Sequence, residues 1–177
     1  PVLTYGLKIL QPGPSNMTKL EKFQKSLLKK VLSLPPNTPD PAIYIISGVL
    51  PIEASIDTKC LTLFNNICRQ DEKSVEKQLA YRQLHIELDS SSSWYVITKK
   101  LLYKYGFSDI FQFLDNPPSK YEWKKLVQKK MDSYWIQRIT HDCTFYSSLT
   151  HLNCDAFLRR NCHSIIDLKN DNNPSKG

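Results

Sequence analysis

The sequence predicts an all-α fold, a multi-helix bundle, and three observations lead to that prediction. Only 5 of the 177 residues are glycine, which argues against a turn-rich β-sandwich. The 11 prolines mark joints between successive segments. Within several of those segments apolar residues recur every three or four positions, the period of a helix. Hydrophobic residues make up 41% of the chain and aromatic residues 11%, so a packed core is expected rather than wholesale disorder.

The first helix is predicted over residues 18–34, after a short apolar segment, 1–10, whose period fits either a strand or a helix start. Thr18 and Glu21 have the spacing of a capping box. One narrow stripe, predicted to face a core, contains Leu20, Phe23, Leu27, Val31 and Leu34. On the opposite side lie Lys22, Lys25 and Lys29, a face suited to an anion. The pair of prolines at 35–36 is expected to end this helix.

Three more helices are predicted before residue 90. A short apolar helix runs to Ile46, with Gly48 in the position that follows a helix C-terminus. Pro51 opens the next helix, whose regular apolar stripe comprises Ile52, Ile56, Cys60, Leu63 and Ile67. Residues 74–88 form a more polar helix with an uncertain register.

Residues 90–93 form a small polar linker, and Ser93 is expected to cap a helix over 94–105 that Gly106 ends. Ser119 and Glu122 form a second capping box at the start of the longest helix, 120–140. Beyond about residue 152 the helical pattern fails. We therefore predict two helical subdomains, 1–89 and 90–152, and an irregular or disordered tail over 153–177.

The charge distribution indicates a polyanionic partner. The formal net charge is +7. Residues 1–34 hold six lysines against Glu21 alone, and residues 117–139 hold six basic residues against two acidic ones, whereas eight acids outnumber five bases over 40–95. Two basic blocks around an acidic middle favour nucleic acid as the partner, with ordinary solvated lysine faces as the alternative reading. The candidate nucleic-acid-binding residues are Lys22, Lys25, Lys29, Lys124, Lys125 and Lys129.

Aromatic side chains lie within the second basic block and could stack on bases: Tyr121, Trp123, Tyr134 and Trp135. At helical spacing such residues serve in the core more often than as a stacking platform, so both readings stay open.

No catalytic or cofactor site is expected in this chain. The phosphate-binding, dinucleotide-binding, metalloprotease and serine-hydrolase motifs are missing, and no adjacent aspartate pair is present to hold two metal ions. The only metal-capable set is His141, Cys143, His151, Cys154, Cys162 and His163. Its spacing fits zinc chelation poorly, so buried thiols and surface histidines are the preferred interpretation and no metal is predicted.

No stretch reaches the ~18 apolar residues of a membrane span. The odd, scattered set of five cysteines favours reduced thiols inside a cell.

An ordered series of short segments resembles the region that follows the catalytic palm in non-LTR, LINE-type retrotransposon reverse transcriptases. It begins with a P-x-L-x-Y-G segment at residues 1–6 and continues through 20–24, 27–29, 32–35 and 48–52. The similarity extends to about residue 152. No single segment is diagnostic, and the order of the series carries the resemblance.

The resemblance implies a thumb over 1–89 and a helical linker over 90–152. It also implies that the chain binds a template–primer, RNA–DNA or DNA duplex, without catalysis of its own, as a fragment or truncated copy. The partners would be the duplex backbone and the palm of the parent polypeptide, which would be an RNA-directed DNA polymerase. The location would be intracellular, in the nucleus. A free-standing helical protein-interaction module without nucleic-acid function is the alternative.

Overall fold

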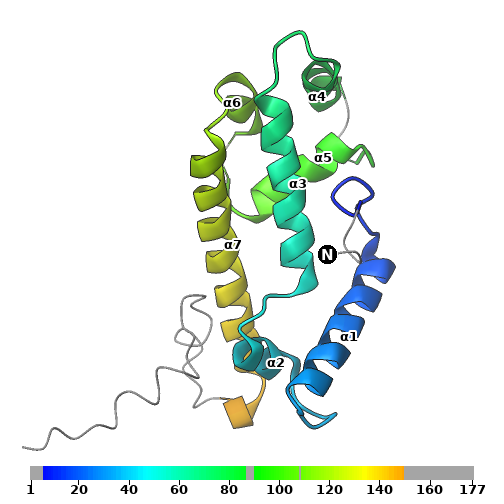
Figure 1. The fold of residues 1–177 in the computed structure, drawn as a ribbon, viewed down its shortest axis with the longest axis vertical. Coiled ribbons are helices and arrows are strands. Elements are labelled where there is room, and N and C mark those ends of the chain that lie inside the picture. The colour runs from blue at the N-terminus through cyan, green and yellow to red at the C-terminus, as the bar shows by residue number, and fades with distance from the viewer. Residues whose placement is uncertain (1–5, 87–89, 108, 150–177) are drawn as a thin grey trace, which may run out of the picture. The chain divides into compact units, whose positions relative to one another are not determined.

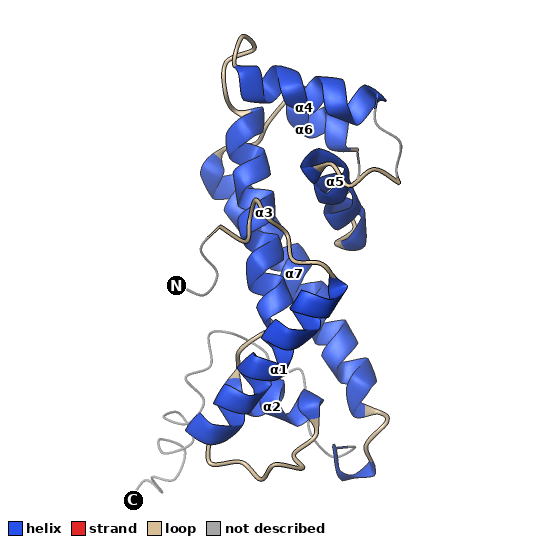
Figure 2. Ribbon diagram, turned by 90° about the vertical axis from the view of Figure 1, so that its right-hand side faces the viewer, coloured by secondary structure: helices blue, strands red, loops and turns tan. Residues whose placement is uncertain are grey.

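The computed structural model describes residues 6–86, 90–107 and 109–149, and over these ranges helices joined by loops and turns are present, with no strand (Figures 1 and 2). The all-α prediction is confirmed. The α-helices are α1 (Pro14–Val31), α2 (Asp40–Ser47), α3 (Ile52–Cys68), α4 (Val75–Ile86), α5 (Trp94–Lys104), α6 (Ile110–Asp115) and α7 (Lys120–Cys143), and a short 3₁₀ turn follows at Ser147–Leu149. The predicted tail, 153–177, and most of the P-x-L-x-Y-G segment lie outside the described residues.

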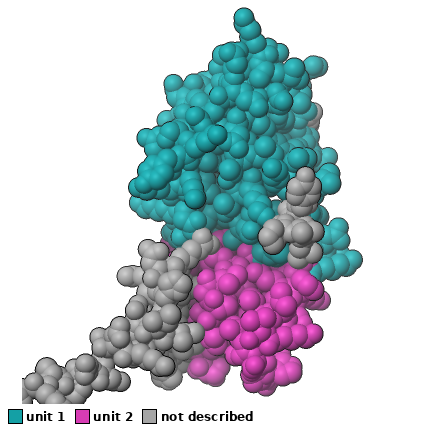
Figure 3. Space-filling view, in the orientation of Figure 1, with its two compact units in different colours: residues 1–19, 52–134 teal, residues 20–51, 135–177 magenta. Residues whose placement is uncertain are grey.

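The chain divides into two compact units, coloured teal and magenta in Figure 3. Unit 1 comprises residues 1–19 and 52–134, and unit 2 comprises residues 20–51 and 135–177. This division differs from the one predicted at residues 90–93. Helix α3 contacts α4 on one side of that linker and α5 and α6 on the other, so the two sides share one core.

Helix α3 is the centre of unit 1. Ten of its 17 residues are buried, and Cys60, Leu61 and Phe64 are completely inaccessible. The first part of α7 packs against it, because the indole N–H of Trp123 donates to the carbonyl oxygen of Leu61 at 2.9 Å. The predicted α3 stripe is therefore the core-facing side of this helix, with Leu63 at its half-buried margin.

In unit 2 the core is supplied by α2 and by the last part of α7. Helix α2 buries five consecutive residues, Pro41 to Ile45, and α7 contributes Trp135, Ile139 and Cys143. Gly48 ends α2 as predicted, with φ of 63° in the left-handed region that glycine adopts without steric cost.

The predicted start of α1 is wrong. The helix begins at Pro14, four residues before Thr18, since proline is well suited to the first turn, where its missing N–H leaves no bond unmade. Thr18 lies inside the helix, and its hydroxyl donates to the carbonyl oxygen of Pro14 at 3.0 Å instead of capping. By contrast the capping box of α7 is confirmed: the Ser119 N–H donates to Glu122 Oε2 at 3.0 Å and the Glu122 N–H to Ser119 Oγ at 3.2 Å.

The side-chain cap predicted for α5 is also wrong in its chemistry. Ser93 occupies the N-cap position, but its hydroxyl makes no capping hydrogen bond and donates instead to the side-chain oxygen of Gln83. Gly106 follows the end of this helix with φ of 67°, as the sequence predicts.

Candidate nucleic-acid interface

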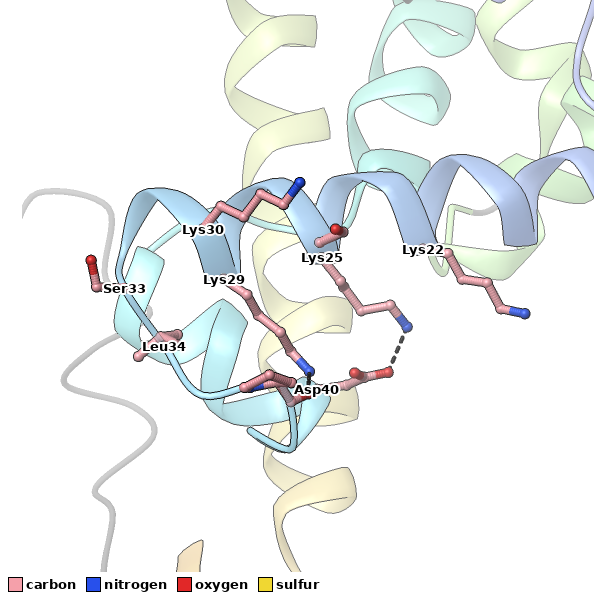
Figure 4. A pocket seen from close by; sticks show the side chains of 9 residues that line it. Lys22, Lys25, Lys29, Lys30, Ser33, Leu34 and Asp40 are labelled. Carbon is pink, nitrogen blue, oxygen red and sulfur yellow. Dashed lines mark hydrogen bonds and ion pairs between the residues drawn. The ribbon is translucent and has the colours of Figure 1, made fainter.

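Four of the five lysines of α1 line a hollow of about 760 Å³ in unit 2, drawn in Figure 4. Lys22, Lys25 and Lys29 recur every three or four residues, so α1 holds them on one side, as its helical period requires. The opposite wall comes from the loop that leads to α2, through Pro36 and Asp40. The three N-terminal lysines named from the sequence therefore line one hollow.

The loop reaches back under the lysines because of how α1 ends. Ser33 adopts a left-handed conformation with φ of 53°, unusual for a residue other than glycine. The Leu34 N–H then donates to the Lys29 carbonyl at 2.8 Å and the Ser33 N–H to the Lys30 carbonyl at 3.2 Å. This pair of bonds is the Schellman arrangement, which reverses the chain direction. The reversal brings residues 36–40 beneath the basic side of the helix.

Two of the three predicted lysines have partners within the unit. Lys25 Nζ lies 2.5 Å from Asp40 Oδ2, and Lys29 Nζ donates to the carbonyl oxygen of Pro36 at 2.6 Å. Figure 4 shows both side chains extending to that loop, whereas Lys22 extends away from Asp40. Asp40 is half exposed, so its ion pair with Lys25 is a surface pair of small energy, about 0–1 kcal/mol, that a polyanion can displace.

Two charged residues of this hollow, Lys30 and Asp40, were not among the candidates named from the sequence. Lys30 also lines it, although the helical wheel places this lysine about 100° from Lys29 and Figure 4 shows it projecting to the other side of the helix. Asp40 places a carboxylate among the lysines and lowers their combined charge. The spacing along α1 gives the position of Lys30, but the place of Asp40 depends on the turn at Ser33.

The apolar stripe of α1 is not the core face that the sequence predicts. None of the 18 residues of α1 is buried, and Phe23, Leu27 and Val31 are 56%, 49% and 71% exposed. Half-buried positions such as Gln24 and Leu28 show that the packed side of the helix is rotated from the stripe. Gln24 fixes that side by donating from its amide to the Leu50 carbonyl at 3.0 Å.

The second predicted set of lysines is spread around α7. Lys124 lines a different hollow, in unit 1, together with residues of α3. Lys125 Nζ lies 4.5 Å from the ring centroid of Tyr121, a cation–π contact, and Lys129 is exposed. The structure does not bring all three together. At 100° per residue Lys125 and Lys129 share one side of α7, whereas Lys124 lies about 100° from Lys125 and about 140° from Lys129.

The aromatic residues of the second block divide between the two readings. Trp123 and Trp135 are 2% and 4% exposed, so they belong to the core. The ring of Tyr134 packs edge-on against Tyr105, with the ring centroids 4.9 Å apart. Only Tyr121 of this set, 66% exposed, has a ring free enough to stack on a base.

A buried ionic cluster lies at the end of α5 in unit 1. The Lys104 ammonium lies 2.6 Å from Glu53 Oε1 and 2.9 Å from Asp57 Oδ2, and Tyr105 donates its hydroxyl hydrogen to Asp57 Oδ2 at 2.6 Å. Desolvation by burial lowers the pKa of Lys104, but the neighbouring carboxylates outweigh it, so that its pKa lies above its ordinary value. Desolvation raises the pKa of Asp57, against the attraction of Lys104. Every member of the cluster has a partner, which marks it as structural.

Among the described residues, no group of three His, Cys, Asp or Glu side chains is placed to hold a metal ion, and four of the six metal-capable residues of the sequence lie outside that range. None of the described helices combines the length and apolar character needed to cross a membrane.

Burial raises the pKa of Cys60 to about 11 and that of Cys68 to about 12, which leaves both as unreactive thiols at neutral pH.

Comparison with known proteins adds no relative: no family model, no curated protein and no solved structure matches this chain.

Proposed function

We propose that the chain is a non-catalytic nucleic-acid-binding segment, the thumb and linker of a non-LTR retrotransposon reverse transcriptase. The observation that carries the proposal is the hollow along α1, where Lys22, Lys25 and Lys29 lie on one side of a single helix. Lysine ammonium groups contact phosphates without reading bases, as a segment that holds a template–primer duplex must do. The ordered resemblance of the sequence supports the proposed parent polypeptide, which would be an RNA-directed DNA polymerase of the nucleus.

The three α1 lysines differ in their contacts, and the proposal therefore gives them different roles. Lys22 carries no ion pair or hydrogen bond within the described residues, so its charge is available to a phosphate. Lys25 and Lys29 are held by Asp40 and Pro36, which fixes their ammonium groups near the loop. A phosphate entering the hollow would meet both ammonium groups already in place and would displace Asp40 from Lys25.

The test is the salt dependence of duplex binding. Replacing Lys22, Lys25 and Lys29 together by alanine removes three candidate phosphate contacts, so the slope of log K against log salt should fall by about 2.7, at about 0.9 per contact. The matched control replaces three exposed basic residues of unit 1, Lys73, Lys100 and Arg82, by alanine. The control has the same net charge, so an equal loss of slope in both variants would mean that general charge, rather than the hollow, binds the duplex.

A second function is favoured by one observation, the exposed apolar side of α1. A helix that presents Phe23, Leu27 and Val31 to solvent has the surface of a protein-interaction module. If this second function holds, sedimentation equilibrium should show that Leu27→Glu loses the self-association or partner binding of the parent protein. The parent should also fail to bind a duplex at low salt. Duplex binding that the lysine triple variant weakens would favour the first function instead.

A further inference from the structure

A second hollow lies between α3 and the first part of α7, both in unit 1, and has a volume of about 380 Å³. This volume is at the lower end of the range for small-molecule pockets, about 300–1,000 Å³. Its lining combines amides and hydroxyls from α3 with two lysines of α7, and Trp123 and Val127 supply apolar wall. The proposed duplex contacts of α1 do not include it.

Asn65 of α3 is the polar group at this hollow that the fold leaves unsatisfied. The residue is only 2% exposed, and within the described residues its side-chain oxygen Oδ1 is buried without a hydrogen-bond partner. An unpaired buried amide costs free energy, and a ligand group can recover it once a rotation of the side chain turns the amide toward the hollow that Asn65 lines. Because a hydroxyl both donates and accepts, a hydroxyl satisfies this amide whichever of its two ends faces the hollow.

The neighbouring polar groups also retain spare acceptor capacity. Thr62 donates its hydroxyl hydrogen to the Thr58 carbonyl at 2.7 Å, which leaves the lone pairs of its oxygen available. The amide nitrogen of Gln128 donates to both carboxylate oxygens of Asp132 at 2.8 Å, which leaves the amide oxygen as an acceptor. Together these acceptors fit a ligand that carries several hydroxyl groups.

Two lysines give the hollow a preference for anionic ligands. Lys120 and Lys124 are four residues apart, hence on the same side of α7, and both line the hollow. Neither forms an ion pair within the part of the chain that the structure describes. Like charges at this spacing repel, and an anion between them relieves the repulsion.

We infer that the α3–α7 hollow binds a phosphorylated sugar, with the phosphate on Lys120 and Lys124 and the sugar hydroxyls on Asn65, Thr62 and Gln128. Such a group occurs in a free sugar phosphate and in a nucleoside monophosphate, and the hollow recognises the chemistry that the two share. The inference is independent of duplex binding by α1, because it concerns other residues of another unit.

The experiment is calorimetric titration of the whole chain with ribose 5-phosphate and with adenosine 5′-monophosphate, beside inorganic phosphate and ribose as reference probes. We expect at least one phosphorylated sugar to bind with a Kd of about 1 mM or tighter. Equal affinities for the two would identify the sugar phosphate as sufficient, and tighter binding of the nucleotide would identify the base as a further contact. No binding of either, or equal binding of inorganic phosphate, would overturn the inference.

Three variants locate the site. Asn65→Leu keeps the side-chain volume and removes the unpaired amide, so the variant should melt at a higher temperature and bind about tenfold more weakly. Thr62→Val and Lys120→Ala change exposed positions, and each should weaken binding while leaving the melting temperature nearly unchanged. Lys129→Ala, about 180° around the helix from Lys120, is the matched control and should bind as the parent does. Unchanged affinity in Asn65→Leu and Lys120→Ala would contradict the site.

Discussion

Helices α1 and α3 are almost equal in length, 18 and 17 residues, yet they make opposite use of their apolar side chains. Helix α3 buries ten residues and forms the centre of unit 1. Helix α1 buries none, although its apolar and polar sides are the more sharply separated of the two. Amphipathic periodicity therefore identifies a helix and its two sides, whereas burial depends on which other elements pack against the apolar side.

The largest expected effect is a matched pair of leucine truncations. Leu61→Ala in α3 removes a completely buried side chain and should lower the free energy of unfolding by about 2–5 kcal/mol. Leu27→Ala in α1 removes a side chain that is 49% exposed and should change it by no more than about 0.5 kcal/mol. Urea titration of both variants measures the difference. Equal losses would mean that the stripe of α1 is buried in solution by a partner.

The ionic cluster of unit 1 gives the next effect. Tyr105→Phe removes the hydroxyl that donates to the buried Asp57 carboxylate. Because hydrogen bonds to charged groups are stronger than neutral ones, the free energy of unfolding should fall by about 1.5–3 kcal/mol. The matched control is Tyr121→Phe, since the Tyr121 hydroxyl has no hydrogen-bond partner in the described residues and the ring is 66% exposed. A Tyr105→Phe protein as stable as the control would show that the cluster contributes little.

The pH dependence of stability sharpens the same comparison. The folded-state pKa of Lys104 is raised above its ordinary value of 10.5, because its two carboxylate partners outweigh the cost of burial. Its stabilising contribution is therefore complete below pH 10.5 and disappears as the pH rises through the folded-state pKa. Urea titrations at alkaline pH should show a steeper loss of stability in the parent than in Lys104→Met. Parallel curves for the two proteins would contradict a raised pKa.

The smallest effect on folding is expected in the hollow of α1. Asp40→Asn removes the carboxylate that pairs with Lys25, and it also removes an acid from the first turn of α2. The unfolding free energy should fall by at most about 1 kcal/mol, as for a surface ion pair and a helix-terminal charge. Affinity for a duplex should rise, because one negative charge leaves the site. Fluorescence anisotropy at low salt measures that rise, and a fall in affinity would show that Asp40 orders the site.

Local signals in the sequence predicted most of the helices correctly. The capping box of Ser119 and Glu122, the left-handed Gly48 and the α3 stripe each depend on neighbours within a few residues, so the sequence contains the whole signal. Thr18 has the same capping spacing, but Pro14 allows α1 to start one turn earlier. Ser93 holds the cap position, yet a side chain ten residues away, Gln83, takes its hydroxyl.

The candidate site could be predicted only in part for a related reason. Helical spacing placed Lys22, Lys25 and Lys29 on one side of α1, and the structure has them there. Asp40 joins them through the reversal at Ser33, a non-glycine residue in the left-handed region that no composition rule indicates. Lys124 and Lys125 lie on different sides of α7 because of the helical period. A sum of charges over residues 117–139 does not distinguish the sides of the helix.

The proposal that the lysines of α1 bind a nucleic-acid backbone is tested most directly by measuring how far a bound duplex shields each lysine from chemical modification. The chain is treated with a reductive methylation reagent with and without a saturating RNA–DNA duplex, and each lysine is quantified by mass spectrometry. We expect the duplex to protect Lys22, Lys25 and Lys29, with Lys73 and Lys100 modified equally in both samples. Unchanged modification of the three α1 lysines in a saturated complex would contradict it.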